Sequence, residues 1–454
     1  MKFRTIYASQ IARLDSSVHT GGGTDDTQAI QRALDIARDE GGVRLVMDGA
    51  ALVSHLTLYS NTTVECLNAD CGFYQIAHTD DSLLTNANWN HYEIETRNVS
   101  LLGGTYNQNC LNQAHDNQHV FDPFGETPES RPFNLCLEFY GVENLLVRDV
   151  TIREFRTFAF TVGCFSRVTV ENVWLDMKHH MMGNQDGFHF WGPGRYLTVR
   201  NCGGCVSDDI MNIGPDERDK VSSITDVLVD GLFLDDAEQA VRLLTRGTGR
   251  LDRVTIRNIT GQYRSFGFYI NPWFPENTHG NFGNILIENV DLKEHPHTYD
   301  YRPPVLFSVG GNIECLTLKN IRHHAGVDSR TLFEFGIPFV TNEISEDSPA
   351  HLQRIQTVIL DDIAITDKDG EPGGREYIQL FDRVDTLALR NVLILKDRTE
   401  PDGTLVGFKA LGEIGTLIFE NVYAKGLKTL FSDETRVKSR LNPIILKNQE
   451  ETKP

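Results

Sequence analysis

The chain has 454 residues, 40% of them hydrophobic, and a formal net charge of -20. Nucleic acids and anionic membranes bind basic surfaces, so this charge argues against both as partners. No apolar run approaches the roughly 20 residues of a membrane helix, and the first ten residues lack the apolar core of a signal peptide. Eight cysteines at irregular spacing indicate reduced thiols. We therefore predict a folded cytoplasmic protein, unless a leader has been removed, and its oligomeric state stays open.

Residues 21–42 predict one well-delimited helix. Thr24 to Asp26 supply capping oxygens at its start, and Gly41 and Gly42 end it. One apolar stripe is formed by Ile30, Ala33, Leu34 and Ala37. Strands are expected at residues 43–47 and 55–58. A helix ahead of many strands can cover the open end of a solenoid, so residues 20–60 are expected to form an N-terminal cap.

From residue 95 onward a short repeat recurs, with the pattern apolar–x–apolar–x–Asn/Asp/Gly–apolar. Its polar position is occupied by Asp149, Asn172, Asn201, Gly231, Asn258, Asn289, Asn320, Asp362, Asn391 and Asn421. A period of about 20 to 30 residues with strands and no helices is typical of a parallel β-helix. Asparagine suits a tight bend because it tolerates left-handed backbone and can bond to stacked neighbours. We predict an all-β protein in which residues 1–435 form one right-handed parallel β-helix and 436–454 a charged tail.

Long insertions interrupt the repeat at about 104–133, 214–222, 271–282, 295–304 and 338–352. In a solenoid such insertions form loops, often on the binding face. Several carry aromatic residues and histidines, among them Trp273. Aromatic walls above a sheet suit sugar rings, but loop aromatics can equally well cover the solenoid. Both readings stay open.

Three aspartates fall at the starts of two short alternating segments. Asp186 opens the first segment, and Asp208 with Asp209 opens the second, 22 residues later. If that spacing is one coil, the two strands become neighbours about 4.8 Å apart and the acids converge. Alternation then places one residue per coil in an outward column: His189, Asn212, Arg242 and Tyr269. Such a column is either ordinary solvated surface or part of a binding site, and the clustered acids favour the second.

The chain resembles the family 28 glycoside hydrolases, the polygalacturonase group of the pectin-lyase-like β-helices. The resemblance covers about residues 20–430. It is carried by the stretch from Gly23 to Ile30, by the stretch from Arg131 to Asn144, and above all by Asn184-x-Asp186-Gly187 followed by Asp208-Asp209. The resemblance implies that these three aspartates are catalytic. It makes Asp208 the general acid, while Asp186 and Asp209 orient and deprotonate water in an inverting reaction without a cofactor. An inverting pair implies carboxyl groups about 6.5–9.5 Å apart.

Two further motifs of that family are absent. Residues 238–242 replace a Gly-His-Gly, and residues 269–271 replace an Arg-Ile-Lys. Because that Arg and Lys hold a substrate carboxylate in the family, the resemblance implies a substrate other than plain galacturonan. We expect an oligosaccharide or polysaccharide substrate. The residues assigned to its binding are His189, Asn212, Glu238, Arg242, Tyr269, His180 and Trp273.

Alternative interpretations concern metals and reaction class. His179, His180 and His189 with Cys202 and Cys205 invite a zinc site, since C-x-x-C is a ligand spacing. Cys202, however, occupies a position that faces the core in other coils, so no metal is predicted. A lyase or epimerase needs groups such as Arg242, His189 and Tyr269 to neutralise a uronate and abstract its proton. A non-catalytic carbohydrate-binding β-helix, such as a phage tail component, is the third alternative.

Overall fold

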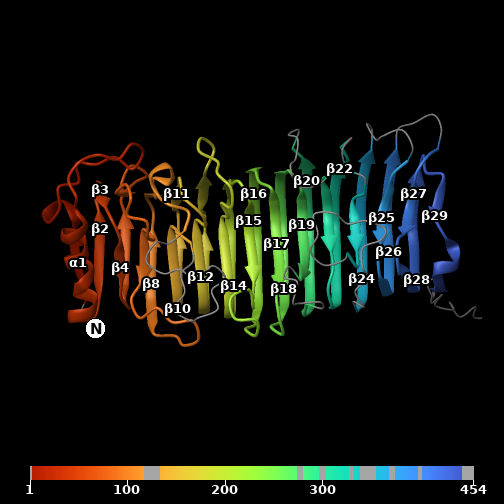
Figure 1. Ribbon diagram of the computed structural model, residues 1–454, viewed down its shortest axis with the longest axis horizontal. Helices are drawn as coiled ribbons and strands as arrows, with labels where there is room; N and C mark the ends of the chain where they lie inside the picture. Colours follow the sequence, from red (N-terminus) through yellow and green to blue (C-terminus); the bar gives the residue numbers. More distant parts are fainter. Residues whose placement is uncertain are drawn as a thin grey trace, which may run out of the picture.

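The computed structural model describes residues 3–116, 133–272, 280–295, 303–326, 329, 331–337, 354–367, 374–396 and 401–441. Figure 1 shows an elongated stack of strands with the helix α1 (Thr27–Glu40) at its N-terminal end. All strand ladders are parallel in the part of the chain that is described. The long parallel sheet with one helix near its start confirms the prediction of an all-β parallel β-helix.

The helix α1 forms as its sequence predicts, and its stripe is buried. Gly41 ends it in a left-handed conformation (φ 100°), and its N–H donates to the carbonyl of Ala37 at 3.1 Å. Of the residues predicted to cap it, Asp25 accepts from the N–H of Thr27 at 2.9 Å, whereas the side chain of Asp26 makes no cap hydrogen bond. Its carboxylate instead accepts from the backbone N–H groups of Arg13 and Leu14 at 2.8 and 2.9 Å. Asp26 therefore ties the N-terminal segment to the start of the helix.

The strands stack in three rows along the solenoid. The longest row contains β1 (Arg4–Tyr7), β2 (Val43–Met47), β5 (Thr62–Cys66), β8 (Thr96–Leu102), β10 (Leu137–Arg148), β12 (Phe160–Glu171), β14 (Phe188–Cys205), β16 (Ile224–Asp236), β18 (Leu251–Tyr263), β20 (Phe282–Glu294), β22 (Ile313–His324), β24 (Ile355–Asp367), β26 (Arg383–Lys396), β28 (Glu413–Lys425) and β30 (Val437–Leu441). A second row contains β4 (Leu56–Leu58), β7 (Leu84–Asn86), the first halves of β10, β12 and β14, β15 (Asp209–Gly214), β17 (Gln239–Thr245), β19 (Phe266–Pro272), β21 (Val305–Val309), β23 (Phe333–Phe335), β25 (Glu376–Leu380), β27 (Thr404–Phe408) and β29 (Thr429–Phe431). A third, short row contains β3 (Ala50–Val53), β6 (Gly72–Gln75), β9 (Thr105–Asn107), β11 (Thr151–Arg153) and β13 (Trp174–Asp176). The described residues also form the 3₁₀ turns η1 (Ala8–Gln10), η2 (Cys110–Asn112) and η3 (Glu434–Arg436).

The repeated polar position makes a tight bend in every coil where it was predicted. All ten residues have left-handed backbone, with φ between 50° and 94°. Their side chains bond along the stack, as where Asn289 donates to Asn258 at 3.1 Å and Asn320 donates to Asn289 at 2.7 Å. These bonds run from coil to coil and fix the register of the solenoid.

The coils begin earlier than the repeat indicates. The strands β2, β5 and β8 already stack before residue 103, and one continuous hydrophobic core runs from Ile6 to Phe431. These first coils bend at a different position, where Asn98 donates to Asn61 at 2.9 Å and Asn144 donates to Asn98 at 3.0 Å. The pattern that starts at residue 149 does not include that position, so the repeat does not mark these coils.

The ends and the thiols complete the architecture. Residues 437–441, assigned to the tail from the sequence, form β30 and pair with β28, and residues 442–454 lie outside the described part. All eight cysteines are free thiols, which confirms that reading of their spacing. Among the described helices, none has the length and apolar character needed to cross a membrane.

Candidate active site

The two acidic segments lie side by side, as their spacing predicts. His189 on β14 pairs with Asn212 on β15, which places Asp186 opposite Asp209 just ahead of the paired strands. The N–H of Gly187 donates to the carbonyl of Asp209 at 2.7 Å. A side chain at Gly187 would lie 2.5 Å from the carbonyl oxygen of Ile210, so only glycine allows this close approach. One coil of the solenoid therefore separates the two segments.

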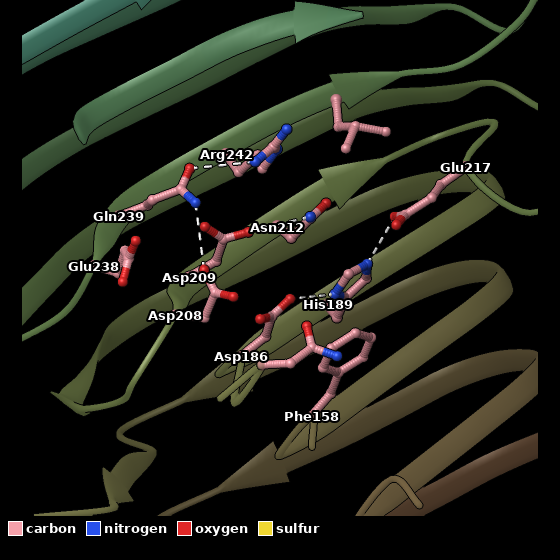
Figure 2. A pocket seen from close by; sticks show the side chains of 12 residues that line it. Phe158, Asp186, His189, Asp208, Asp209, Asn212, Glu217, Glu238, Gln239 and Arg242 are labelled. Carbon is pink, nitrogen blue, oxygen red and sulfur yellow. Dashed lines mark hydrogen bonds and ion pairs between the residues drawn. The ribbon is translucent and has the colours of Figure 1, made fainter. Parts of the chain in front are cut away.

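The three aspartates converge on one cavity of about 330 Å³. One oxygen from each of Asp186, Asp208 and Asp209 lies within 4.8 Å of the others. Figure 2 shows these carboxyl groups gathered on adjacent coils, with Glu238 beside them. The lining consists of Phe158, Asn184, Asp186, His189, Asp208, Asp209, Asn212, Glu217, Glu238, Gln239, Arg242 and Leu244. The structure thus brings the predicted acids together with four of the seven residues assigned to binding.

The crowded carboxyl groups hold protons more tightly than isolated acids. Burial, reinforced by the charges of Asp186 and Glu238, raises the pKa of Asp208 to about 7. Burial and the neighbouring carboxylates also raise the pKa of Asp209 well above its usual value. Asp208 is half-buried, whereas only 4% of Asp209 is exposed. Of the two, Asp208 is the better placed to pass a proton to a group in the cavity.

His189 lies between two carboxylates. Its Nδ1 is 2.8 Å from Asp186 Oδ2, and its Nε2 is 2.8 Å from Glu217 Oε2. Burial opposes protonation of the ring, but Glu217 and Asp186 outweigh it and raise the pKa of His189 to about 9. The Phe158 ring stacks on the imidazole, with the ring centres 4.3 Å apart. Figure 2 shows the two side chains next to each other. The side chain is 1% exposed, so the prediction that His189 faces solvent is wrong.

The predicted column exists, but it is covered. His189, Asn212, Arg242 and Tyr269 are in register on four adjacent coils, and each is at most 5% exposed. Asn212 donates to Asp209 Oδ2 at 3.3 Å, and the Arg242 guanidinium lies 4.4 Å from the centre of the Tyr269 ring. Neither of these residues lies on an open strand surface. Asn212 and Arg242 reach the cavity, whereas Tyr269 supports Arg242 from the next coil.

Sequence reasoning assigned no site role to five lining residues, Phe158, Asn184, Glu217, Gln239 and Leu244, and three of them contact Asp208 or His189. Glu217 lies in the insertion at 214–222, which was marked as a loop but not as a source of an acid. Its carboxylate also accepts from Trp191 Nε1 at 2.8 Å. Gln239 donates to Asp208 Oδ1 at 3.3 Å and directly follows the assigned Glu238. Phe158 carries no signal in the sequence, because its role depends on the coil that follows it.

Besides Tyr269, two more residues assigned to substrate binding are not found in the cavity lining. The Nδ1 atom of His180 lies 3.2 Å from Glu154, away from the acids that line the cavity. Trp273 lies outside the described residues. Of the histidines and cysteines considered for zinc, Cys202 is fully buried in the core position predicted for it, and His189 is held by the two carboxylates.

The fold defines the class: the chain is a parallel β-helix, and it is similar to polygalacturonases. No family model matches the sequence. Over 271 residues the chain is 24% identical to a polygalacturonase of Persea americana, in a match covering 53% of this chain and 56% of that protein. The match therefore spans about half the length of the curated relative.

Two solved structures share the fold. A family 28 exopolygalacturonase of Yersinia enterocolitica matches with a TM-score of 0.59 and 14% identity over 94% of this chain and 79% of that one. A tailspike protein of an E. coli bacteriophage matches with the same TM-score of 0.59 and 11% identity, over 92% and 75% of the two chains. At such identities the two structures support the β-helix fold alone. The chemistry has to be argued from the residues of the site.

Proposed function

We propose that this protein is a glycoside hydrolase that cleaves an oligosaccharide or polysaccharide, with Asp186, Asp208 and Asp209 as its catalytic residues. The observation that carries the proposal is the convergence of these three carboxyl groups in one cavity, with the pKa of Asp208 raised to about 7. Glycoside hydrolysis needs one carboxyl group that donates a proton and one that acts on water or on the sugar. A cluster that holds a proton near neutrality supplies both.

The roles follow from exposure and partners. Asp208 is the most exposed of the three acids and serves as the proton donor to the leaving oxygen. Asp209 and Asp186 face the same cavity and act on water, Asp186 held in place by His189 at 2.8 Å. His189 is therefore a positioning residue, because both of its ring nitrogens are engaged by carboxylates.

The inverting course stays a prediction from the resemblance. One oxygen from each acid lies within 4.8 Å of the others, but this distance joins selected oxygens and not the carboxyl groups, which are about 6.5–9.5 Å apart in an inverting pair. The distance therefore gives the inverting course no support. The anomeric form of the first product, read by proton NMR before mutarotation, decides between inversion and retention.

The charge of the cavity supports a neutral sugar as the substrate. Five carboxyl groups line it, from Asp186, Asp208, Asp209, Glu217 and Glu238. The cations in the lining are His189, which lies between two of those carboxylates, and Arg242. Even with protons held on Asp208 and Asp209, the three other carboxyl groups outnumber the two cations, so the binding of a uronate is disfavoured. This agrees with the absence of the Arg-Ile-Lys motif, and the predicted cytoplasmic location favours short imported saccharides.

The lyase or epimerase alternative loses its candidate base. Proton abstraction from a uronate needs a basic nitrogen or phenolate that can reach the sugar. Both nitrogens of His189 are engaged, and Tyr269 packs beneath Arg242 with its ring stacked on Phe266 at 4.2 Å. The non-catalytic alternative is supported only by the fold that this chain shares with the tailspike protein.

A screen of purified protein against neutral and acidic oligosaccharides tests the proposal. Reducing-sugar release and ultraviolet absorbance of unsaturated products are followed in parallel. Hydrolysis raises the first alone, as we expect, and a lyase raises both. Binding without either signal, across substrates that the protein demonstrably binds, contradicts the proposal and favours the non-catalytic alternative.

A further inference from the structure

A second group of side chains with metal-ligating atoms lies outside the cavity. Cys110 comes from η2, Glu154 directly follows β11, and His180 lies in the segment 177–187 after β13. One ligating atom from each residue, a thiol sulfur, a carboxylate oxygen and a ring nitrogen, lies within 4.8 Å of the others. Three separate segments of the chain therefore place mixed sulfur, oxygen and nitrogen donors at one point.

The contact between His180 and Glu154 is not an ordinary hydrogen bond. Nδ1 of His180 lies 3.2 Å from Glu154 Oε1. That nitrogen is nevertheless a buried atom without a hydrogen-bond partner, because the angles at the contact are unsuitable. In tetrahedral zinc sites with Zn–N near 2.0–2.1 Å and Zn–O near 2.0–2.2 Å, the nitrogen and oxygen ligands are about 3.3 Å apart. The observed separation matches two ligands of one metal ion.

The backbone fixes the other pair of donors. The N–H of Cys110 donates to the carbonyl oxygen of Glu154 at 2.9 Å, which holds the two residues together. Glu154 itself has left-handed backbone (φ 45°), a conformation that costs free energy for a residue with a side chain. Cys110 is fully buried, so its sulfur is presented from the interior towards the half-exposed His180.

We propose that Cys110, Glu154 and His180 bind one divalent transition-metal ion, zinc being the fitting case. A sulfur donor excludes calcium and magnesium, which take oxygen ligands. Three protein ligands and one water are a normal zinc set. One thiolate and one carboxylate balance the charge of the ion. Burial raises the pKa of the Cys110 thiol to about 11, so binding must displace the thiol proton.

The ion has a structural consequence for the cavity. His180 belongs to the segment that ends at Asp186, and the neighbouring Gln185 donates to the carbonyl of Phe155 at 2.8 Å. A metal that joins His180 to Glu154 therefore braces the segment that presents Asp186. Only this consequence rests on the proposed function, whereas metal binding itself does not.

Cobalt(II) is the direct probe. The full-length protein, reduced and stripped of metal, is titrated with Co²⁺ without oxygen. We expect one equivalent to bind with a thiolate-to-cobalt charge-transfer absorption in the near ultraviolet, and zinc to abolish it by displacement. Cys110→Ser removes the absorption, and His180→Gln weakens binding by at least about 10-fold. Cobalt bound to the aspartates of the cavity gives no such absorption, because no sulfur lies there, so Asp208→Asn retains it.

The matched control is Cys315→Ser, which alters the partly buried thiol of β22. It should leave the absorption unchanged. Absence of the absorption at stoichiometric cobalt, its survival in Cys110→Ser, or its loss in Cys315→Ser overturns the proposal. If Cys110→Ser does not fold, the titration of His180→Gln decides, since that side chain is 35% exposed. Hydrogen exchange completes the test: zinc should slow exchange of amides in residues 178–186, and unchanged exchange there removes the bracing role.

Discussion

At the scale of single residues, the site depends on how buried charges are paired. Asp186 and Glu217 both contact His189 at 2.8 Å, yet burial raises the pKa of Asp186 while His189, working against burial, lowers that of Glu217. For Asp186 burial is the largest cause, and the charge of Glu217 adds to it, so the bond to His189 does not reverse the rise. His189 thus offsets the repulsion in the acidic cluster, and its loss is expected to affect charge as well as packing.

Stability should depend on the protonation of His189. Its folded pKa of about 9 lies above the ordinary value of about 6.5, so its contribution is complete below pH 6.5 and is lost as pH rises through 9. At about 1.36 kcal/mol per pKa unit, this shift corresponds to a loss of about 3 kcal/mol in the free energy of unfolding. Denaturant unfolding at pH 6 and pH 10 measures it.

His189→Gln should remove this part of the pH dependence, and the exposed His19→Gln should keep it. A His189→Gln protein with the same pH dependence as the wild type contradicts the pairing described for this residue.

The rate of hydrolysis should fall at alkaline pH. A general acid works only while it is protonated, and the pKa of Asp208 is about 7. We therefore expect kcat/KM to fall about tenfold per pH unit above 7. Glu238→Gln removes one of the charges that raise this pKa, so the alkaline limb should move to lower pH. A limb that stays in place in Glu238→Gln excludes Asp208 as the titrating group.

At the scale of elements, the tight bend in each coil, with its coil-to-coil side-chain bonds, fixes the register of the solenoid. The repeat could be read from the sequence because one residue per coil needs left-handed backbone, and asparagine provides it with an amide that bonds to the next coil. Asn289 illustrates this, with φ 56° and bonds to both Asn258 and Asn320. Strand bounds such as Val43–Met47 followed from the same alternation.

Asn289→Ala should lower the free energy of unfolding by about 1–2 kcal/mol, because alanine is strained at positive φ and makes no side-chain bonds. Asn289→Gly should lower it less, since glycine accepts the backbone and loses only the exposed bonds. Urea unfolding of the two variants compares them directly. Both variants lack the amide bonds, so if Asn289→Gly is the less stable variant, the left-handed bend does not disfavour alanine and the explanation of this position is contradicted.

At this scale, the sequence does not predict which side chains bury the column of His189, Asn212, Arg242 and Tyr269. Alternation correctly placed His189, Asn212 and Arg242 on the outer side of their strands. Their burial depends on Phe158 from the preceding coil and on Glu217 from an insertion, and neither follows a repeat. Side chains that come from irregular segments cannot be assigned to a strand position by period alone.

At the scale of the whole molecule, one core and three rows of parallel strands account for the chain. A solenoid places residues that are one coil apart next to each other, so Asp186 and Asp209 could be joined from sequence spacing alone. The positions of Glu154 and Cys110 could not, because they lie in turns outside the counted repeat.

The far-ultraviolet circular dichroism spectrum should be dominated by β-structure. The helix α1 accounts for 14 of the 454 residues, a far smaller share than the roughly 30–35% helix of an average globular protein. Deconvolution that returns a third or more helix contradicts the architecture. The expected spectrum should persist in the site variants, since each replaces a side chain and leaves the coils intact.

The measurement that tests the central claim most directly is the turnover of Asp208→Asn on a substrate found in the screen. Asparagine keeps the shape and hydrogen bonding of the side chain and removes the transferable proton. General acid catalysis is worth about 10²–10⁴-fold, so kcat should fall by that factor while the substrate still binds. Asp235→Asn, on the exposed surface of β16, is the control and should keep its rate. If Asp208→Asn retains more than about a tenth of the wild-type rate, Asp208 is not the proton donor and the account of this site is contradicted.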